Sequence, residues 1–408
     1  MYDILLSVWG SSAGRQGARP GQGGRAGGLS PDELYAVSRK VRELSRGFTR
    51  DRALAGERYL SDPDLLGAYL LHFWPISYAQ ALLGITMMRR ARRAMTAATA
   101  GSVLAGAGGI SAGAAPGLGP VLDVGAGPGP VSLALLDSGA SKVTACDRSA
   151  AALSLARRIA GERGQALATQ PWDAMSTTPP PRGPFDLIAI GHTINELWAG
   201  HPDRVSLRVG LVRRLAEQLA PEGRVLVMEP ALKTTAQEAI QVRDGLVKAG
   251  FFVELPCIWQ GACPALPDGT CHGEFEWNPL PGMVRLAHAA RIGRETLKMA
   301  WFVLGKRAAA PEAGRTVDPD SCPDGELYRV VSDPLLSKSG RVRYLVCGPQ
   351  GRFALSASRS IRDPGLSPFF RLARGDGIRF TGAQRRETGW GLDKGSTVEV
   401  VQRVPRLG

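Results

Sequence analysis

Apolar residues recur at helical spacing in three segments between residues 30 and 98. The first segment opens with Ser30 as a candidate helix cap and Pro31 at the first helical position, and acids follow in the first turn. The second repeats this order of cap, proline and acid, and a Trp-Pro pair at 74–75 interrupts it. We therefore expect a small helical domain over 30–98. Residues 1–29 are rich in Gly, Arg and Ser without periodicity, and we expect a disordered leader there.

From residue 119 onward, short apolar and β-branched runs alternate with amphipathic helical patterns. Such alternation is typical of an α/β fold with a parallel, doubly wound sheet, which we assign to residues 119–307. The Gly/Ala run at 99–118 is expected to be a flexible linker that precedes this domain. The candidate strands are 121–125, 142–147, 185–191, 224–229, 251–256 and 301–306.

The last part of the chain has a different pattern. A segment rich in Pro, Gly and acids at 308–325 is predicted to be a second linker. Short alternating strands follow over 326–408, as in a small β-barrel. This tail holds 15 basic and 7 acidic residues, so +8 of the net charge of +13 lies in it.

The charge balance of the whole chain favours a polyanionic partner. Lys and Arg number 50, of which 42 are Arg, against 37 acids. Such an excess is expected of a nucleic-acid-binding protein, although Arg richness can also follow from genomic composition. No stretch approaches the roughly 20 apolar residues of a membrane helix, and the first residues do not have the pattern of a signal peptide. Six cysteines are too few for a disulfide scaffold. We therefore expect a cytoplasmic, monomeric protein with reduced thiols that binds neither membranes nor DNA.

The strongest local motif follows the first candidate strand. Glycines alternate after this strand, and a helical pattern begins at Pro130, where the nicotinamide fingerprint would have its third Gly or Ala. An acid, Asp147, ends the second strand, where it can bind both hydroxyls of a ribose. Trp172 and Asp173 follow the third strand as candidate adenine contacts. The alternative is a tight strand-to-helix connection that binds no ligand, but the order of strand, glycine turn, helix and distal acid along the sequence favours a cofactor site. The arrangement resembles motif I of class I S-adenosylmethionine methyltransferases, which adds the cofactor contacts Asp123, Gly125, Gly127 and Gly129.

The loop after the fourth strand (IAIGHTINELW) is where a methyl acceptor usually binds in this fold. Methyltransferases that act on amines carry an Asn/Asp-Pro-Pro-aromatic motif there, and this chain has His192, Asn195 and Glu196 instead. These three residues are our catalytic candidates. A structural alternative has equal weight, because Asn195 or Glu196 could cap the next helix. Glu229, after the fifth strand, lies on the same expected edge of the sheet.

Three cysteines fall within fifteen residues in a Gly/Pro-rich insertion after the candidate strand 251–256. Their gaps do not match the CxxC spacing of a zinc ribbon. With a fourth thiolate they would suit an iron–sulfur cluster, and with His272 they would form a three-Cys, one-His zinc site. Three unconnected core thiols are the remaining alternative. Cys146 is expected in the core, and Cys322 in the second linker could compete as the fourth ligand. The metal candidates are Cys257, Cys263, Cys271 and Cys347.

Several of these segments together resemble one known family. RYLSDPDLLGAYLLHFWPISYAQAL, VLDVGAGPGP, HTINELW, PCIWQGACPALPDGTCH and LLSKSGRVRYLVCGPQG are similar to segments of the methyltransferase-like relatives of mitochondrial small-ribosomal-subunit assembly factors. The resemblance covers residues 55–380 and is most specific in the cysteine segment. It implies a [4Fe-4S] cluster on the four cysteines and binding to small-subunit ribosomal RNA, with a methyltransferase fold that can act purely as a scaffold. His272 is followed by Gly, where this family has an aromatic residue.

These observations leave three functional hypotheses. The preferred one is an assembly factor of the small ribosomal subunit that binds ribosomal RNA and carries a structural iron–sulfur cluster. In this hypothesis, RNA phosphates are contacted by arginines such as Arg341, Arg343, Arg371 and Arg374. The second is an active S-adenosylmethionine-dependent methyltransferase of ribosomal RNA. The third is a methyltransferase of proteins or small molecules whose insertion is held by zinc.

Overall fold

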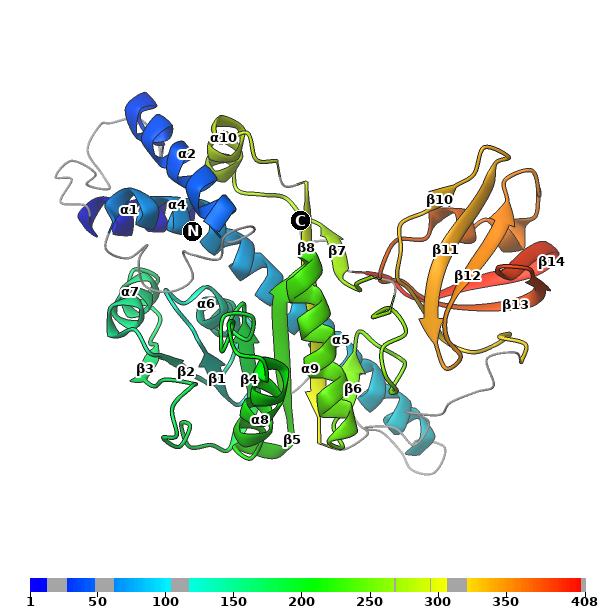
Figure 1. Ribbon diagram of the computed structural model, residues 1–408, viewed down its shortest axis with the longest axis horizontal. Coiled ribbons are helices and arrows are strands. Elements are labelled where there is room, and N and C mark those ends of the chain that lie inside the picture. Colours follow the sequence, from blue (N-terminus) through cyan, green and yellow to red (C-terminus); the bar gives the residue numbers. More distant parts are fainter. Residues whose placement is uncertain are drawn as a thin grey trace.

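A computed structural model describes residues 1–12, 28–47, 62–103, 117–267, 269–293, 295–306 and 321–404. It consists of an α/β domain and a C-terminal β-barrel, which stand side by side in Figure 1. Among the described residues, no helix is long and apolar enough to span a membrane. Most of the Pro-rich segment expected to be a second linker, residues 307–320, lies outside the described ranges.

The α/β domain is built on one eight-stranded sheet. Its strand order is β3-β2-β1-β4-β5-β8-β6, and β7 pairs with β8 off this path. The five strands from β3 to β5 run parallel, whereas β8 runs antiparallel to β5, β6 and β7. The predicted doubly wound sheet is confirmed, but it is mixed rather than wholly parallel. The strands are β1 (Pro120–Val124), β2 (Lys142–Asp147), β3 (Ala168–Pro171), β4 (Phe185–Gly191), β5 (Leu219–Pro230), β6 (Phe252–Leu255), β7 (Gly273–Glu276) and β8 (Thr296–Gly305).

Alternate residues of the central strands face two separate cores. In β5, Val225 and Val227 belong to the core under one face, whereas Leu226 and Met228 belong to the core under the other. Helices α8 and α9 cover the first face and lie in front of the sheet in Figure 1. The helices of this part of the chain are α6 (Pro130–Asp137), α7 (Ala150–Gly161), α8 (Arg204–Ala216), α9 (Lys233–Lys248) and α10 (Pro281–Ala289).

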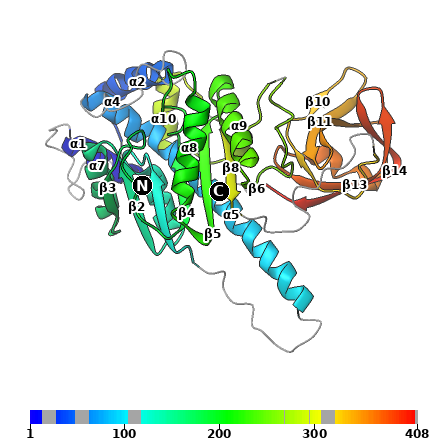
Figure 2. The same cartoon turned by 60° about the horizontal axis from the view of Figure 1, so that its bottom comes forward.

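The N-terminal helices cover the second face of the sheet. They share one hydrophobic core with it, and Gly84 of the last helix leaves room for Leu226 and Met228 of β5. They therefore form a layer of the α/β domain rather than the separate helical domain that the sequence suggested. Figure 2 shows the far end of α5 projecting beyond the sheet. The elements are α1 (Tyr2–Ser12), α2 (Pro31–Arg46), α4 (Pro63–Ala68), a π-helix η2 (Tyr69–Phe73) and α5 (Trp74–Val103).

Two expectations for this region are wrong, and one is confirmed. The start of the predicted disordered leader is the helix α1, which buries Leu5, Val8 and Trp9. The predicted break at 74–75 is absent. The π-helical turn that precedes Trp74 is wider than an α-helical turn, so it accommodates the Pro75 ring and the helix continues. The predicted helix cap at Ser30 is confirmed, since its side chain accepts the amide proton of Glu33.

The C-terminal segment forms the predicted small barrel. Strands β9, β11, β12, β14 and β13 close into a ring of five, and β10 extends the β11 side. Aromatic residues such as Tyr328, Tyr344 and Phe380 fill its interior. The strands are β9 (Tyr328–Val330), β10 (Leu335–Leu336), β11 (Arg341–Gly348), β12 (Gly351–Ser358), β13 (Gly377–Arg386) and β14 (Gly389–Gln402).

Candidate functional site

The glycine loop after β1 has the backbone that a bound nucleoside cofactor requires. Gly125, Gly127 and Gly129 have φ of 68°, 52° and 79°, in the left-handed region that favours glycine. A Cβ on Gly125 would stand 2.3 Å from the Thr193 hydroxyl. The loop therefore lies close to the neighbouring strand end and to the start of α6, where backbone N–H groups can face a ligand.

Asp147 at the end of β2 fixes this loop. Its Oδ2 accepts a hydrogen bond from the Gly127 amide at 2.9 Å, and its Oδ1 accepts one from the Ser149 amide at 2.8 Å. On the other side of the loop, the buried indole of Trp74 donates to the carbonyl of Pro128 at 2.9 Å. Both the second strand and the N-terminal helical layer therefore hold the loop in place.

A large pocket opens over this loop. Its volume is about 810 Å³, within the usual range for small-molecule sites. Among the predicted site residues, the pocket is lined by Gly125, Gly127, Asp147, Asp173, His192, Asn195 and Glu196. Asp123 and Gly129 are not in the lining. Asp123 is buried below the loop, where it accepts a hydrogen bond from Ser132, and Gly129 packs against Ala156.

The burial of Asp123 affects its ionisation. Burial, together with the nearby charge of Asp147, raises the pKa of Asp123 to about 7, and the hydrogen bond from Ser132 opposes this. Asp123 therefore does not line the pocket, and its predicted contact with the cofactor stays a prediction. Its role in this structure is to support the strand end beneath the loop.

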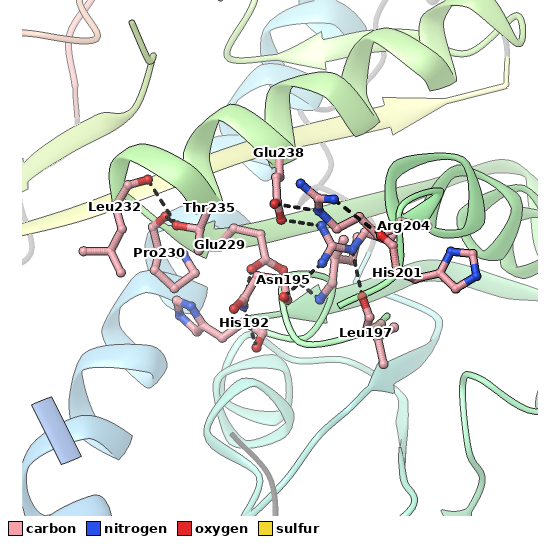
Figure 3. A network of polar contacts seen from close by, with 12 residues as sticks. His192, Asn195, Leu197, His201, Arg204, Glu229, Pro230, Leu232, Thr235 and Glu238 are labelled. Carbon is pink, nitrogen blue, oxygen red and sulfur yellow. Dashed lines mark hydrogen bonds and ion pairs between the residues drawn. The ribbon is translucent and has the colours of Figure 1, made fainter. Parts of the chain in front are cut away.

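The acceptor loop is held by a buried carboxyl group that the sequence only hinted at (Figure 3). Glu229 accepts hydrogen bonds from the Ile194 amide at 2.9 Å and from Asn195 Nδ2 at 2.6 Å. The Asn195 amide also donates to the His192 carbonyl at 3.1 Å. Burial and the charge of Glu196 raise the pKa of Glu229 to about 8. Asn195 thus shapes the loop and caps no helix, because the next helix starts only at Arg204.

A buried arginine supports the same loop from the outer side. Arg208 of α8 donates to the carbonyls of Asn195 and Leu197, both at 3.0 Å. Its charge is balanced by Glu238 of α9 at 2.6 Å, which Arg204 also contacts at 2.8 Å. The loop accommodates positive φ values at His192 and Trp198, which cost energy outside glycine. A rigid network therefore maintains a strained turn beside the pocket.

The N-terminal layer contributes a wall of the pocket that sequence reasoning missed. Tyr69 and Phe73 of η2 and Gln80 of α5 line it. Gln80 donates through Nε2 to the Lys298 carbonyl at 3.0 Å, so its Oε1 faces His192 Nε2 at 2.8 Å. Because Oε1 can only accept, His192 carries a proton on Nε2. The apolar face of the 69–80 segment was the only sequence signal, and it does not distinguish a pocket wall from a core.

The metal candidates come from both parts of the molecule. Cys257, Cys263 and Cys271 lie in the insertion between β6 and β7, and together with Arg329 and Arg374 of the barrel region they line a second, small cavity. The pKa of Cys347, on β11, is raised by burial and then by the charges of the other three cysteines. All four thiols therefore lie near one another at the junction of the two domains.

The other cysteines lie elsewhere. Cys146 is buried in β2 as expected, and Cys322 is exposed. Among the described residues, no group of three or more Cys, His, Asp or Glu side chains is arranged so that it could hold a metal ion. His272 has a buried Nδ1 without a hydrogen-bond partner.

The strand order with its antiparallel β8, the glycine loop and the acid at the end of β2 define a class I methyltransferase fold, whose cofactor is S-adenosylmethionine. More particularly, residues 121–226 match the family model described as a methyltransferase domain.

Solved structures give weaker similarities to this chain. The ribosomal protein L11 methylase of Lactobacillus delbrueckii subsp. bulgaricus is 16% identical with a TM-score of 0.28, over 46% of this chain and 70% of that one. A methyltransferase of Pyrococcus furiosus is 14% identical with a TM-score of 0.31, over 46% and 75%. TrmN of Thermus thermophilus is 20% identical with a TM-score of 0.29, over 47% and 45%. No curated protein matches this chain.

Proposed function

We propose that this protein is an RNA-binding assembly factor of the small ribosomal subunit, with an S-adenosylmethionine-binding domain and a [4Fe-4S] cluster between its two domains. The observation that carries the proposal is the convergence of thiols from the insertion and from the barrel at one junction. A cluster held by both domains would fix the barrel against the α/β domain. The two would then form one composite surface.

The residues at the junction fit an iron–sulfur cluster. Four thiols supply the usual ligand set for a [4Fe-4S] cube. Burial raises the pKa of all four, and that of Cys271 to about 12, so a bound metal is needed to keep them as thiolates. In a cube each cysteine binds its own iron atom, so the thiolates need not approach as closely as the ligands of one zinc ion. This favours the cluster over the zinc alternative.

The RNA-binding part of the proposal rests on the barrel. Arg341 and Arg343 alternate on the exposed face of β11, and the backbone amide of Arg359 bonds to Gly340 at the same end of the barrel. We call these three arginines the β11 patch. Beside it, Leu335 is 50% exposed and pairs with Arg343. Exposed guanidinium groups on a rigid sheet suit phosphates of structured RNA.

The other two predicted phosphate contacts are placed differently. Arg371 is exposed on a short turn outside the β11 patch. Arg374 is half-buried at the domain junction, where it pairs with Asp333 at 2.9 Å. It also lies close enough to Cys271 to lower the pKa of that thiol. We therefore exclude Arg374 from the proposed RNA surface.

Two measurements test the proposed function. Anaerobic purification followed by an absorption spectrum with iron and sulfide analysis should give a brown protein with about four irons, and Cys347→Ser should lose most of the iron. Cys322→Ser is the matched control and should keep it. Filter binding at fixed salt should then show tighter binding to small-subunit than to large-subunit ribosomal RNA. A colourless protein, or equal binding to both RNAs, contradicts the corresponding half of the proposal.

A second candidate function, methylation of ribosomal RNA, is favoured by the oriented ring of His192. Bound S-adenosylmethionine would supply a methyl group activated by the sulfonium. His192 lines the pocket and its ring is oriented by Gln80, so it is the candidate base that would take the proton of an acceptor N–H or O–H while the acceptor's lone pair bonds to the methyl carbon. Transfer of labelled methyl groups to isolated small subunits should then fall in His192→Gln but not in His201→Gln. No labelling by the wild type would exclude this second function and leave the scaffold.

A further inference from the structure

Two buried arginines from different domains flank the same cysteine. Arg243 of α9 is 2% exposed, and Arg329 of β9 is 7% exposed. Both side chains line the same small cavity as Cys257. Burying a guanidinium away from water is costly unless a charge or a full set of hydrogen bonds compensates it. The charge balance around this pair therefore indicates what binds there.

Arg329 has only neutral hydrogen-bond partners. Its Nε donates to the Pro256 carbonyl at 3.1 Å, and Nη1 donates to the Gly375 carbonyl and to Gln402 Oε1, both at 2.9 Å. In the described part of the chain, no carboxylate lies within ion-pair distance of its guanidinium. The charge of Asp376 also acts on this guanidinium, but Asp376 is itself paired with Arg403 at 2.7 Å.

The position of Arg329 links the two domains. It is the cross-strand neighbour of Cys347 in the β9–β11 pair, so both side chains lie on the same face of the barrel. Its bond to Pro256 reaches the residue before Cys257, at the start of the insertion. Arg329 thus contacts the cysteine segment of the α/β domain, and its own strand lies beside the barrel strand that carries Cys347.

Arg243 is only partly compensated. It pairs with Asp244 at 2.7 Å and donates to the carbonyls of Trp259 and Gly261, while its buried Nε–H has no partner. The other oxygen of Asp244 accepts the Cys263 amide at 2.9 Å, so this carboxylate serves the loop as well. Two carboxylates, Asp244 and Asp376, therefore stand among three cations, the two buried arginines and Arg403, and a further negative charge is needed beside the buried pair.

We propose that Arg243 and Arg329 are the counter-charges of the metal–thiolate cluster and hold it at a raised reduction potential. This inference rests on the proposed function, since it requires the cluster. Four thiolates outweigh the positive charge of an iron–sulfur core, and reduction adds one more negative charge. Two fixed guanidinium groups stabilise the reduced form more than the oxidised form, because a larger negative charge interacts more strongly with them. Both arginines are positioning residues and bind no iron.

The test is the midpoint potential of the full-length, anaerobically reconstituted protein, followed by its visible absorption during a redox titration. Arg329→Gln should move the potential to more negative values, by about a tenfold change in the reduced-to-oxidised ratio, or about 59 mV for one electron. Arg329→Lys keeps the charge and should stay near the wild type. Arg379→Gln, on the exposed face of β13, is the matched control and should not change the potential. Arg243→Gln should shift it in the same direction as Arg329→Gln.

The outcomes separate this inference from the proposal beneath it. A wild type without iron overturns both. A wild type with iron and an unchanged potential in Arg329→Gln overturns only the counter-charge role. Equal shifts in Arg329→Gln and Arg329→Lys also overturn it, because geometry rather than charge would then be responsible. If Arg329→Gln does not fold, the potentials of Arg329→Lys and Arg243→Gln decide in the same way.

Discussion

Asp147→Asn is the substitution that most directly tests the cofactor pocket. In the structure its two carboxylate oxygens accept the amides of Gly127 and Ser149. An asparagine can accept only one of these bonds and turns an N–H toward the other amide. It also loses the charge that would face the ribose hydroxyls of a bound cofactor. Because each hydrogen bond to a charged group contributes about 1.5–3 kcal/mol, we expect a loss of about 3 kcal/mol, or roughly 100-fold in affinity.

Isothermal titration with S-adenosylmethionine measures this loss. Asp173→Asn is the matched control, because Asp173 also lines the pocket but its Oδ1 bonds only to the nearby Met175 amide. We expect that variant to bind within about tenfold of the wild type. Circular dichroism should show the same helix content in all three proteins. If Asp147→Asn binds as tightly as the wild type, the assignment of the ribose contact is wrong.

Three further predictions concern the acceptor loop, the glycine loop and the barrel. Since the pKa of Glu229 is raised from 4.5 to about 8, folding takes up a proton between these values and stability falls as pH rises through this window. In urea unfolding, the free energy of unfolding of Glu229→Gln relative to the wild type should thus rise between pH 5 and pH 8, by at most about 5 kcal/mol. If the two proteins differ in this free energy by the same amount at both pH values, the reasoning is refuted. Trp74→Phe leaves a buried carbonyl of the glycine loop without its donor, and should cost about 1–3 kcal/mol by thermal unfolding and weaken cofactor binding. Replacing Arg341, Arg343 and Arg359 by Gln should lower the slope of log affinity for RNA against log salt by about 2, and an unchanged slope would exclude the β11 patch.

The sheet, the glycine loop and the barrel could be predicted because each depends on local pattern. Strand-turn-helix alternation and Asp147 at a strand end can be recognised from a few neighbouring residues, and the structure places both as expected. The direction of β8, the last strand of the α/β domain, could not be predicted. The insertion after β6 reverses the chain, so β8 enters the sheet antiparallel between β5 and β6. Nothing in the apolar run of β8 itself indicates its direction.

The N-terminal helices show where local reasoning fails. Leu5, Val8 and Trp9 have helical spacing, but the Gly/Arg-rich residues that follow suggested a disordered leader. The wall formed by Tyr69 and Phe73 depends on a π-helical turn, which no residue pattern specifies. Burial of polar residues is equally hard to predict, because the sequence does not show that Asp123 is buried beside the pocket without lining it.

Glu274 shows how the two sites of the molecule are joined. It lies on β7, three residues after Cys271, and lines the large pocket. Its Oε1 accepts the Thr296 hydroxyl at 2.7 Å and pairs with Lys298 at 3.0 Å, so it is fixed against β8. Its Oε2 is 4.0 Å from Nε of Arg374, at the barrel side of the junction. The candidate metal ligand Cys271 thus lies just before β7, and the pocket residue Glu274 lies on that strand. Because only two residues separate Cys271 from Glu274, we expect a displacement of Cys271 to reach the part of the pocket wall that Glu274 forms.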